Sequence, residues 1–328
     1  MQVNMARDVV YTNGVIAVKE QSLLGAKLNK LCEGSADEAF RAVIESGFGK
    51  GAEAQSVFGY ENLLTADERD LDLFIREYAP TAADEAYFLV PRDFHNAKAA
   101  IKANYATGDF DEMKAPSGLI PAEQILSCVK ENDFSPLYDG LRQACEGAAA
   151  IFSEERETKA TGAEIGIIFE NAKNQRLLKV CARNRFLKKL IQTKADMTNI
   201  LTAMRAQTPE YALNNYISGG KLSFDKLQLL LENEAEKAAR AFDGTPYADF
   251  VKTCFADKTE GKPCAQAELM RDNLETYFLG AHKYELKKSQ PFLYYVLRRR
   301  AENANLRIIF VCLMAGMDEG DIKSRLRG

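Results

Sequence analysis

The residues best suited to metal chemistry are the acids of the run Asp67-Glu-Arg-Asp70-Leu-Asp72. Carboxylate oxygens are the ligands that Mg²⁺ prefers in proteins, so Asp67, Asp70 and Asp72 could form the magnesium site of an all-α enzyme. Acids also gather in the first turn of a helix, where they interact favourably with the helix dipole. This second explanation requires no ligand, and we favour it over metal binding.

A glycine-rich stretch and two histidines could supply other chemistry. The run Ser46-Gly-Phe-Gly-Lys-Gly51 resembles a phosphate-binding loop, but Ile44 stands where the Walker pattern has its first glycine, and Gly51 replaces the hydroxyl residue after the lysine. His95 and His282 have no cysteine or histidine at metal-ligand spacing beside them. We therefore expect no catalytic residue, no metal site and no cofactor, and we interpret the glycines as the end of a helix.

One polar pair, an acid three residues before an asparagine, occurs three times. Roughly one hundred residues separate each asparagine from the next, and a glycine with a new apolar segment follows each pair. A spacing of three places both side chains on one face of a helix. Because a site copied three times indicates architecture rather than catalysis, we interpret these residues as fixtures that set how helices meet. The fixtures, with one basic residue that follows the last pair, are Asp93, Asn96, Asp196, Asn199, Glu302, Asn305 and Arg307.

A second internal match supports a repeated unit. The segment from Leu23 to Phe48 matches the segment from Leu222 to Tyr247 without gaps, including leucines, alanines and an arginine at the same places. We therefore predict three similar helical repeat domains, spanning residues 1–108, 109–211 and 212–328.

The elements that carry these residues are predicted to be helices. A long C-terminal helix from Pro291 to Gly316 has one apolar stripe, and Pro291 and Gly316 suit its two ends. Residues 161–205 are typical of a helical hairpin with its turn near Arg183 and Asn184. Further helices are expected over Lys19 to Cys32, from the capping boxes at Ser35 and Thr65, over Ser223 to Phe242, and from Ala265 to about Lys288. The expected apolar stripe comprises Leu293, Leu297, Ala301, Ala304, Ile308, Val311 and Ala315. Long segments of helical period and few alternating runs predict an all-α protein.

Basic residues concentrate in two places, between residues 176 and 194 and in the triplet Arg298-Arg-Arg300. The net charge of -4 gives no general attraction to nucleic acid, and no base-stacking module is visible. We interpret these stretches as a solvated or partner-facing side of helices. The positions expected to face a partner protein are Arg183, Arg185, Lys188, Lys189, Arg298 and Arg299.

Composition indicates a globular chain with more than one domain, because the 328 residues are 46% hydrophobic and 27% charged. Seven cysteines without a CxxC pair predict buried, reduced thiols. Residues 1–14 lack the apolar core of a signal peptide, and the longest apolar run, Ile308 to Gly316, is too short to span a membrane. We expect a cytoplasmic protein that would reach a membrane only by docking.

The C-terminal run Pro291-Phe-Leu-Tyr-Tyr-Val-Leu-Arg-Arg-Arg-Ala-Glu-x-x-Asn-Leu-Arg-Ile-Ile309 resembles the signature of the C subunit of the V/A-type rotary ATPases, called the d subunit in eukaryotes. Tyr11-x-Asn13 near the start is similar to the opening helix of that family, and the middle runs Lys194-Ala-Asp-Met-Thr-Asn-Ile-Leu-Thr202 and Gly219-Gly-Lys-Leu222 also match. The resemblance spans nearly the whole chain.

The chain departs from the family pattern at a few positions. Val15 and Ala17 stand where the family often has arginines, and the residues just before Gly316 lack a lysine that is common there. These departures leave the expected fold unchanged and concern particular contacts with other subunits.

The resemblance implies a funnel of three similar all-α domains around a pseudo-threefold axis. It also implies a non-catalytic rotor subunit of the central stalk, which joins the D and F subunits of the shaft to the membrane proteolipid ring. Such a protein would transmit torque for ATP synthesis or for ATP-driven proton or sodium transport. It would be a monomer within a hetero-oligomeric complex, at the cytoplasmic side of the inner membrane. The alternatives are an unrelated helical-repeat adaptor and the magnesium-dependent enzyme described above.

Overall fold

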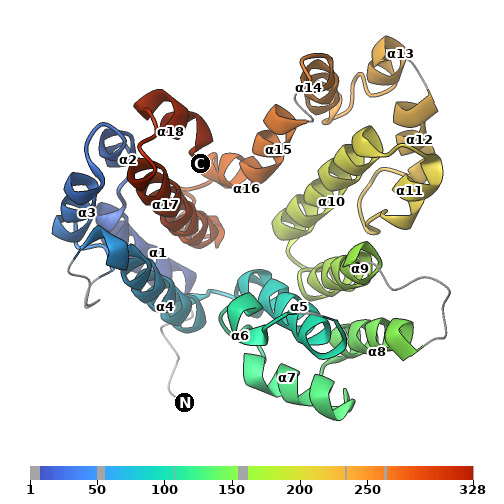
Figure 1. Cartoon of the computed structure of the whole chain (residues 1–328), viewed down its shortest axis with the longest axis horizontal. Coiled ribbons are helices and arrows are strands. Elements are labelled where there is room, and N and C mark those ends of the chain that lie inside the picture. Colours follow the sequence, from blue (N-terminus) through green and yellow to red (C-terminus); the bar gives the residue numbers. More distant parts are fainter. Residues whose placement is uncertain are drawn as a thin grey trace. The chain divides into compact units, whose positions relative to one another are not determined.

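The computed structural model describes residues 8–49, 56–106, 108–153, 162–232, 235–261 and 264–327. Every regular element within these ranges is a helix, which confirms the predicted all-α class. The chain divides into two compact units, one formed by Met1–Glu85 with Asp272–Gly328 and the other by Ala86–Arg271 (Figure 1). We refer to them as unit 1 and unit 2. The division into three domains stays a prediction.

Unit 1 brings the two ends of the chain together. Its helices are α1 (Val9–Lys19), η2 (Glu20–Ser22), α2 (Lys27–Leu31), α3 (Ala36–Glu45), η3 (Val57–Gly59), α4 (Tyr60–Tyr78), α16 (Leu274–Gly280), α17 (Gln290–Met314) and α18 (Glu319–Arg325). The helix α17 contacts α1, α2, α3, α4, α16 and α18 (Figure 1). It is therefore the central element of this unit.

Aromatic rings fill the core around α17. The ring of Phe310 lies 6.1 Å from that of Phe40 and 5.2 Å from that of Tyr60, while Phe74 of α4 lies 5.7 Å from Phe292 and 5.2 Å from Tyr295. Aromatic pairs at these separations contribute beyond the area they bury. They join α17 to α3 and α4, which come from the opposite end of the sequence.

The predicted helix from Pro291 to Gly316 is confirmed within two residues, but its predicted apolar stripe is only partly right. Leu293 is buried and Ile308 packs against the core, whereas Ala304 and Val311 face solvent. The buried face instead runs through Phe292, Val296 and Arg299 and continues to Phe310. Arg299, Glu302 and Asn305 of this face find partners inside the unit, which lowers the cost of their burial, so the face need not be uniformly apolar.

Two expected helices near the N-terminus differ from the structure. The segment from Lys19 to Cys32 is not one helix, because Gly25 takes a positive φ of 50° and turns the chain between η2 and α2. Thr65 does not start a helix, since it lies inside α4. The capping box at Ser35 is confirmed, with reciprocal bonds between Ser35 and Glu38 at the start of α3.

Unit 2 consists of helical hairpins and short connecting helices. They are most of α5 (Ala82–Tyr105), then α6 (Phe110–Met113), α7 (Ala122–Glu131), α8 (Asp139–Ser153), α9 (Gly162–Val180), α10 (Arg185–Arg205), α11 (Pro209–Asn214), α12 (Phe224–Glu232), α13 (Ala235–Arg240), α14 (Ala248–Thr259) and α15 (Ala265–Asp272). The predicted hairpin turn near Arg183 is confirmed, because Asn184 caps the start of α10 through a 3.1 Å bond from the N–H of Leu187. The helix expected over Ser223 to Phe242 is helical over Phe224–Glu232 and Ala235–Arg240, and residues 233–234 lie outside the described residues. The single helix expected from Ala265 to Lys288 is divided into α15 and α16.

The seven cysteines are all buried and unbridged, as the sequence predicts. No helix in the described part of the chain is long and apolar enough to cross a membrane.

Candidate functional site

The first acid-x-x-Asn pair, on α5, binds the chain that follows this helix. Asp93 is fully buried, and its Oδ1 accepts a hydrogen bond from the N–H of Ile120 at 3.1 Å. Its Oδ2 accepts a bond from the hydroxyl of Tyr138 at 3.1 Å. Asn96 Oδ1 accepts the N–H of Ala115 at 2.7 Å. The pair therefore holds α5 against the turn that precedes α7 and the segment that precedes α8.

The second pair, on α10, makes the same kinds of bond. Asp196 Oδ1 accepts the N–H groups of Lys221 and Leu222, each at 3.0 Å, and its Oδ2 accepts the hydroxyl of Tyr247. Asn199 exchanges two bonds of 2.8 Å with the backbone N–H and C=O of Ile217. In the first and the second pair alike, the acid binds a turn and a tyrosine. The asparagine of each pair binds a backbone group that lies 19 or 18 residues after it in the sequence.

The tyrosines that bind these acids, the half-buried Tyr138 and the buried Tyr247, are held in their neutral form. Burial, followed by the charge of Asp93, raises the pKa of Tyr138, and burial with the hydrogen bond to Asp196 raises the pKa of Tyr247. Each hydroxyl therefore donates to its carboxylate. The match of Leu23–Phe48 to Leu222–Tyr247 contained Tyr247, but no sequence argument assigned it this role.

Glycines allow the close approach of the turns to both acids. A Cβ on Gly118 would lie 2.2 Å from Asp93 Oδ1, and a Cβ on Gly220 would lie 2.0 Å from Asp196 Oδ1. Both distances are shorter than any non-bonded contact allows. Each of these two positions therefore requires glycine, because any side chain there would collide with the carboxylate of the pair.

The third pair, on α17, joins the two ends of the chain within unit 1. Glu302 Oε1 accepts the N–H of Gly25 at 2.9 Å. Asn305 donates from Nδ2 to the carbonyl of Arg327 at 2.6 Å and accepts the N–H of Arg327 at 2.9 Å. The asparagine again binds a later segment, whereas the acid binds a turn from the start of the sequence. The helices α2 and α3 of the segment Leu23–Phe48 contact α17, just as α12 of the matching segment Leu222–Tyr247 contacts α10.

A buried ion-pair cluster, absent from the sequence-based expectations, lies beside the third pair. Arg299 Nε lies 2.9 Å from Asp67 Oδ1 and 3.0 Å from Oδ2, and Arg299 Nη1 lies 3.4 Å from Glu302 Oε2. Asn303 donates to Asp67 Oδ2 at 3.2 Å, and the guanidinium lies 4.1 Å from the ring centroid of Phe48. Burial raises the pKa of Asp67, and the charge of Arg299 opposes that rise.

This cluster corrects two expectations. Arg299 was expected to face a partner, but only 7% of it is exposed and its guanidinium is bound to Asp67. Asp67 was a candidate magnesium ligand, but its carboxylate is occupied by Arg299 and Asn303. In the described ranges, no three histidine, cysteine or acidic side chains are arranged to hold a metal ion.

The other basic candidates lie at the surface. Arg183, Arg185, Lys188 and Lys189 are exposed around the start of α10, and Arg298 is half-buried. Arg307 is an exposed residue of α17 that pairs with Glu61 through two bonds of 2.9 Å. The hydrogen bond from Arg307 holds the pKa of Glu61 below its usual range. The α10 group belongs to unit 2, and Arg307 belongs to unit 1.

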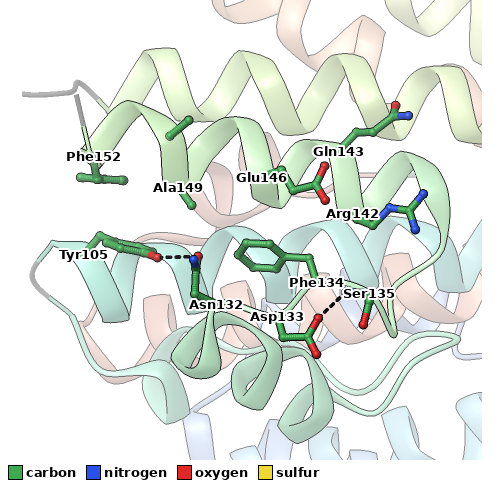
Figure 2. Close-up of a pocket in the computed structure, with 11 residues that line it drawn as sticks. Tyr105, Asn132, Asp133, Phe134, Ser135, Arg142, Gln143, Glu146, Ala149 and Phe152 are labelled. Carbon is green, nitrogen blue, oxygen red and sulfur yellow. Dashed lines mark hydrogen bonds between the residues drawn. The ribbon is translucent and has the colours of Figure 1, made fainter.

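A pocket lies in unit 2, between the end of α5, the end of α7 and α8 (Figure 2). Its volume is about 810 Å³. The rings of Tyr105 and Phe152 stack at one end with centroids 5.2 Å apart, and the Tyr105 hydroxyl donates to Asn132 at 3.4 Å. The lining contains one serine and no histidine, cysteine or lysine. No sequence pattern indicated this pocket, because its lining residues come from three separate segments.

Known proteins are similar to this chain over nearly its whole length. Residues 12–325 match the family model described as ATP synthase (C/AC39) subunit. The C subunit of the A-type ATP synthase from Methanococcoides burtonii is 20% identical over 283 residues, which cover 81% of this chain and 74% of the relative. All the bonded pairs described above lie within the matched ranges or at their C-terminal edge.

Proposed function

We propose, because this chain belongs to the ATP synthase (C/AC39) subunit family, that it is the non-catalytic central-stalk subunit of a V/A-type rotary ATPase. In this role it joins the D and F subunits of the shaft to the membrane proteolipid ring and transmits torque between ATP turnover and proton or sodium transport. The observation that carries the proposal is the family match over residues 12–325. The resemblance of the C-terminal run to the signature of this family agrees with it.

A torque-transmitting link must be stiff. Each ion that crosses a potential of ~100 mV carries about 2.3 kcal/mol, and deformation of the link would dissipate this work. The three acid-x-x-Asn pairs supply such stiffness, because each binds a long helix to a separate segment through buried or half-buried hydrogen bonds. Each bond contributes about 1 kcal/mol net, and breaking one leaves a buried polar group without a partner. We therefore assign Asp93, Asp196, Glu302 and the paired asparagines an architectural role.

Three related domains over residues 1–108, 109–211 and 212–328 stay part of the proposal, and the repeated bonds support the repetition, although each acid binds a residue beyond its own domain boundary. The pairs on α5 and α10 share their acid, tyrosine, glycine and asparagine contacts. Three such domains around a pseudo-threefold axis would form the funnel that the resemblance implies. The contact of Glu302 with Gly25 indicates that the third repeat includes residues from both ends of the chain.

The exposed basic group on α10 is suited to an acidic surface of a partner protein. Arg185, Lys188 and Lys189 lie in the first turns of the helix, where positive charge interacts unfavourably with the helix dipole. They therefore cost the helix stability, and a partner that carries acids would offset this cost. Arg183, just before the helix, and Arg298 in unit 1 are further candidates for such contacts. The assembled complex would hold the chain at the cytoplasmic side of the inner membrane.

Association with the proposed partners tests this function. The full chain is immobilised and incubated in detergent with the D–F shaft and, separately, with the purified proteolipid ring. We expect the wild-type chain to retain both the shaft and the ring. If the basic group on α10 contacts the shaft, replacing its four residues by alanine should abolish retention of the shaft. Retention of neither the shaft nor the ring by the wild-type chain would overturn the proposal.

A further inference from the structure

Unit 1 exposes large aromatic and aliphatic side chains in one short segment. Tyr277 of α16 is 84% exposed, Tyr284 is 78% exposed and Leu286 is 64% exposed. These three large side chains, which lie within ten residues, stay in contact with water in the isolated chain and gain nothing from burial. An exposed group of this kind indicates a contact surface.

This segment is fixed to the N-terminal helix. Asn13 of α1 donates from Nδ2 to the carbonyls of Leu286 at 2.8 Å and Lys288 at 3.0 Å. Tyr11, which is half exposed, lies two residues before Asn13 and stacks on Tyr78. The exposed residues around Leu286 are therefore held in place by α1, and Tyr277 is held by its position in α16. We call Tyr277, Tyr284, Leu286 and the lysines among them the tyrosine–lysine surface.

Lysines lie beside Tyr284 and Leu286 in the sequence, and Glu285, the acid of the segment Tyr277–Lys288, has basic partners. Lys283 lies 4.9 Å from the ring centroid of Tyr284. Lys287 is exposed and makes no ion pair with any described residue. Glu285 lies 2.9 Å from Lys288 and 3.0 Å from His282, so its charge is already compensated. The surface is thus basic and apolar at the same time.

The combination of exposed tyrosine with lysine favours a lipid surface over a protein partner. Lysine is depleted in the cores of protein–protein interfaces, which favour arginine beside aromatic residues. Tyrosine and lysine together are typical of the membrane–water interface, where the ring sits at the level of the headgroups and the ammonium reaches the lipid phosphates. Positive charge near an anionic bilayer strengthens such binding.

We propose that the tyrosine–lysine surface of unit 1 contacts the headgroups of anionic phospholipids. The contact is peripheral: Tyr277, Tyr284 and Leu286 enter the headgroup layer, while Lys283 and Lys287 bind lipid phosphates. The proposal goes beyond the torque-transmitting role and does not depend on it. Lipid binding and association with other subunits are therefore tested separately.

Flotation of the full chain with vesicles tests the proposal. We expect the wild-type chain to float with phosphatidylcholine vesicles that contain phosphatidylglycerol and to remain unbound with phosphatidylcholine alone. Raising the salt concentration weakens the binding, since its charge component is screened. The double variant Tyr277→Ser/Tyr284→Ser should lose most of the binding, and Lys287→Glu should reduce the affinity about fivefold or more.

A matched control comes from unit 2. Tyr211 and Leu213 of α11 are also about half exposed, but the neighbouring residues carry no lysine cluster. The variant Tyr211→Ser/Leu213→Ser should bind vesicles as the wild type does. Circular dichroism melting shows that each variant is folded before it is compared. The proposal is overturned by no binding to anionic vesicles, by equal loss in the control, or by variants that bind vesicles normally and instead lose a partner protein in detergent.

Discussion

Arg299 and Asp67 form a buried ion pair although 232 positions separate them in the sequence. The guanidinium binds both carboxylate oxygens, and the pair shares its site with Glu302 and Asn303. This contact joins α17 to α4 inside the core of unit 1. The ion pair lies directly beside the third acid-x-x-Asn pair, because Arg299 also contacts Glu302.

Removing one member of this pair should destabilise the fold strongly. Arg299→Met leaves the Asp67 carboxylate buried without its cation, which costs about 3–5 kcal/mol. The double variant Asp67→Leu/Arg299→Met should recover part of this loss, because neither charge then remains. Urea unfolding of the full chain measures the differences. Equal stability of wild type and Arg299→Met would contradict the account.

The exposed pair of Arg307 and Glu61 provides the comparison. Both side chains are nearly half exposed, so solvent screens their attraction. Arg307→Met should cost about 1 kcal/mol or less. A cost as large as that of Arg299→Met would show that burial is not what makes the first pair important.

Asn305→Leu should destabilise the chain without abolishing a reaction. The change removes both hydrogen bonds to the backbone of Arg327, and the expected cost is about 1–3 kcal/mol. The exposed Asn214, at the end of α11, is the control, and its change to leucine should alter stability by about 0.5 kcal/mol or less. Thermal unfolding and assembly with the partner proteins are the measurements. A variant with unchanged melting and unchanged assembly would count against the architectural role of the motif.

Alanine at Gly118 or Gly220 should also be destabilising. The added methyl group would collide with Asp93 or Asp196, and relief of the clash should cost about 1–3 kcal/mol. Gly147 lies within α8, where the nearest atom to an added Cβ is 4.0 Å away. Gly147→Ala should therefore stabilise the chain by about 0.5–1 kcal/mol through helix propensity. Chemical unfolding of the three single variants decides whether the signs differ as expected.

The two carboxylate-bound tyrosines predict loss of stability at high pH. Their pKa values are raised in the folded chain, so above the unfolded value of about 10 only the unfolded chain releases these protons. Stability is fully present below that value and falls as the pH rises, by up to about 1.4 kcal/mol per pH unit for each group. Melting temperatures between about pH 8 and 11 measure the slope. The slope should be shallower in Tyr138→Phe/Tyr247→Phe, and an unchanged slope would refute the assignment.

Local signals were sufficient to predict much of the helical structure. The Ser35 capping box and the turn at Asn184 depend on neighbouring residues, and both occur as expected. Thr65-x-x-Glu68 has the same local pattern as Ser35-x-x-Glu38, yet it lies inside α4. Tertiary packing continues that helix through the pattern, so a capping box alone does not locate a helix start.

Long-range contacts explain why the core of unit 1 was predicted less well. Arg299 stands in a run of three arginines that looks solvent-facing, and its partner Asp67 is identified only by the fold. The triplication did single out three acids that the structure shows to be buried. Asp93, Asp196 and Glu302 are all inaccessible to solvent, but the loops that they bind could not be deduced from spacing alone.

Coupling in a reconstituted complex tests the central claim most directly. Vesicles containing the complete rotary ATPase, or the same complex assembled without this chain, are supplied with ATP, and ATP hydrolysis is measured together with proton and sodium uptake. The account predicts that ATP hydrolysis continues without the chain while ion uptake is lost, and that adding the purified chain restores uptake. Ion uptake at the full rate in the complex that lacks the chain would contradict the account.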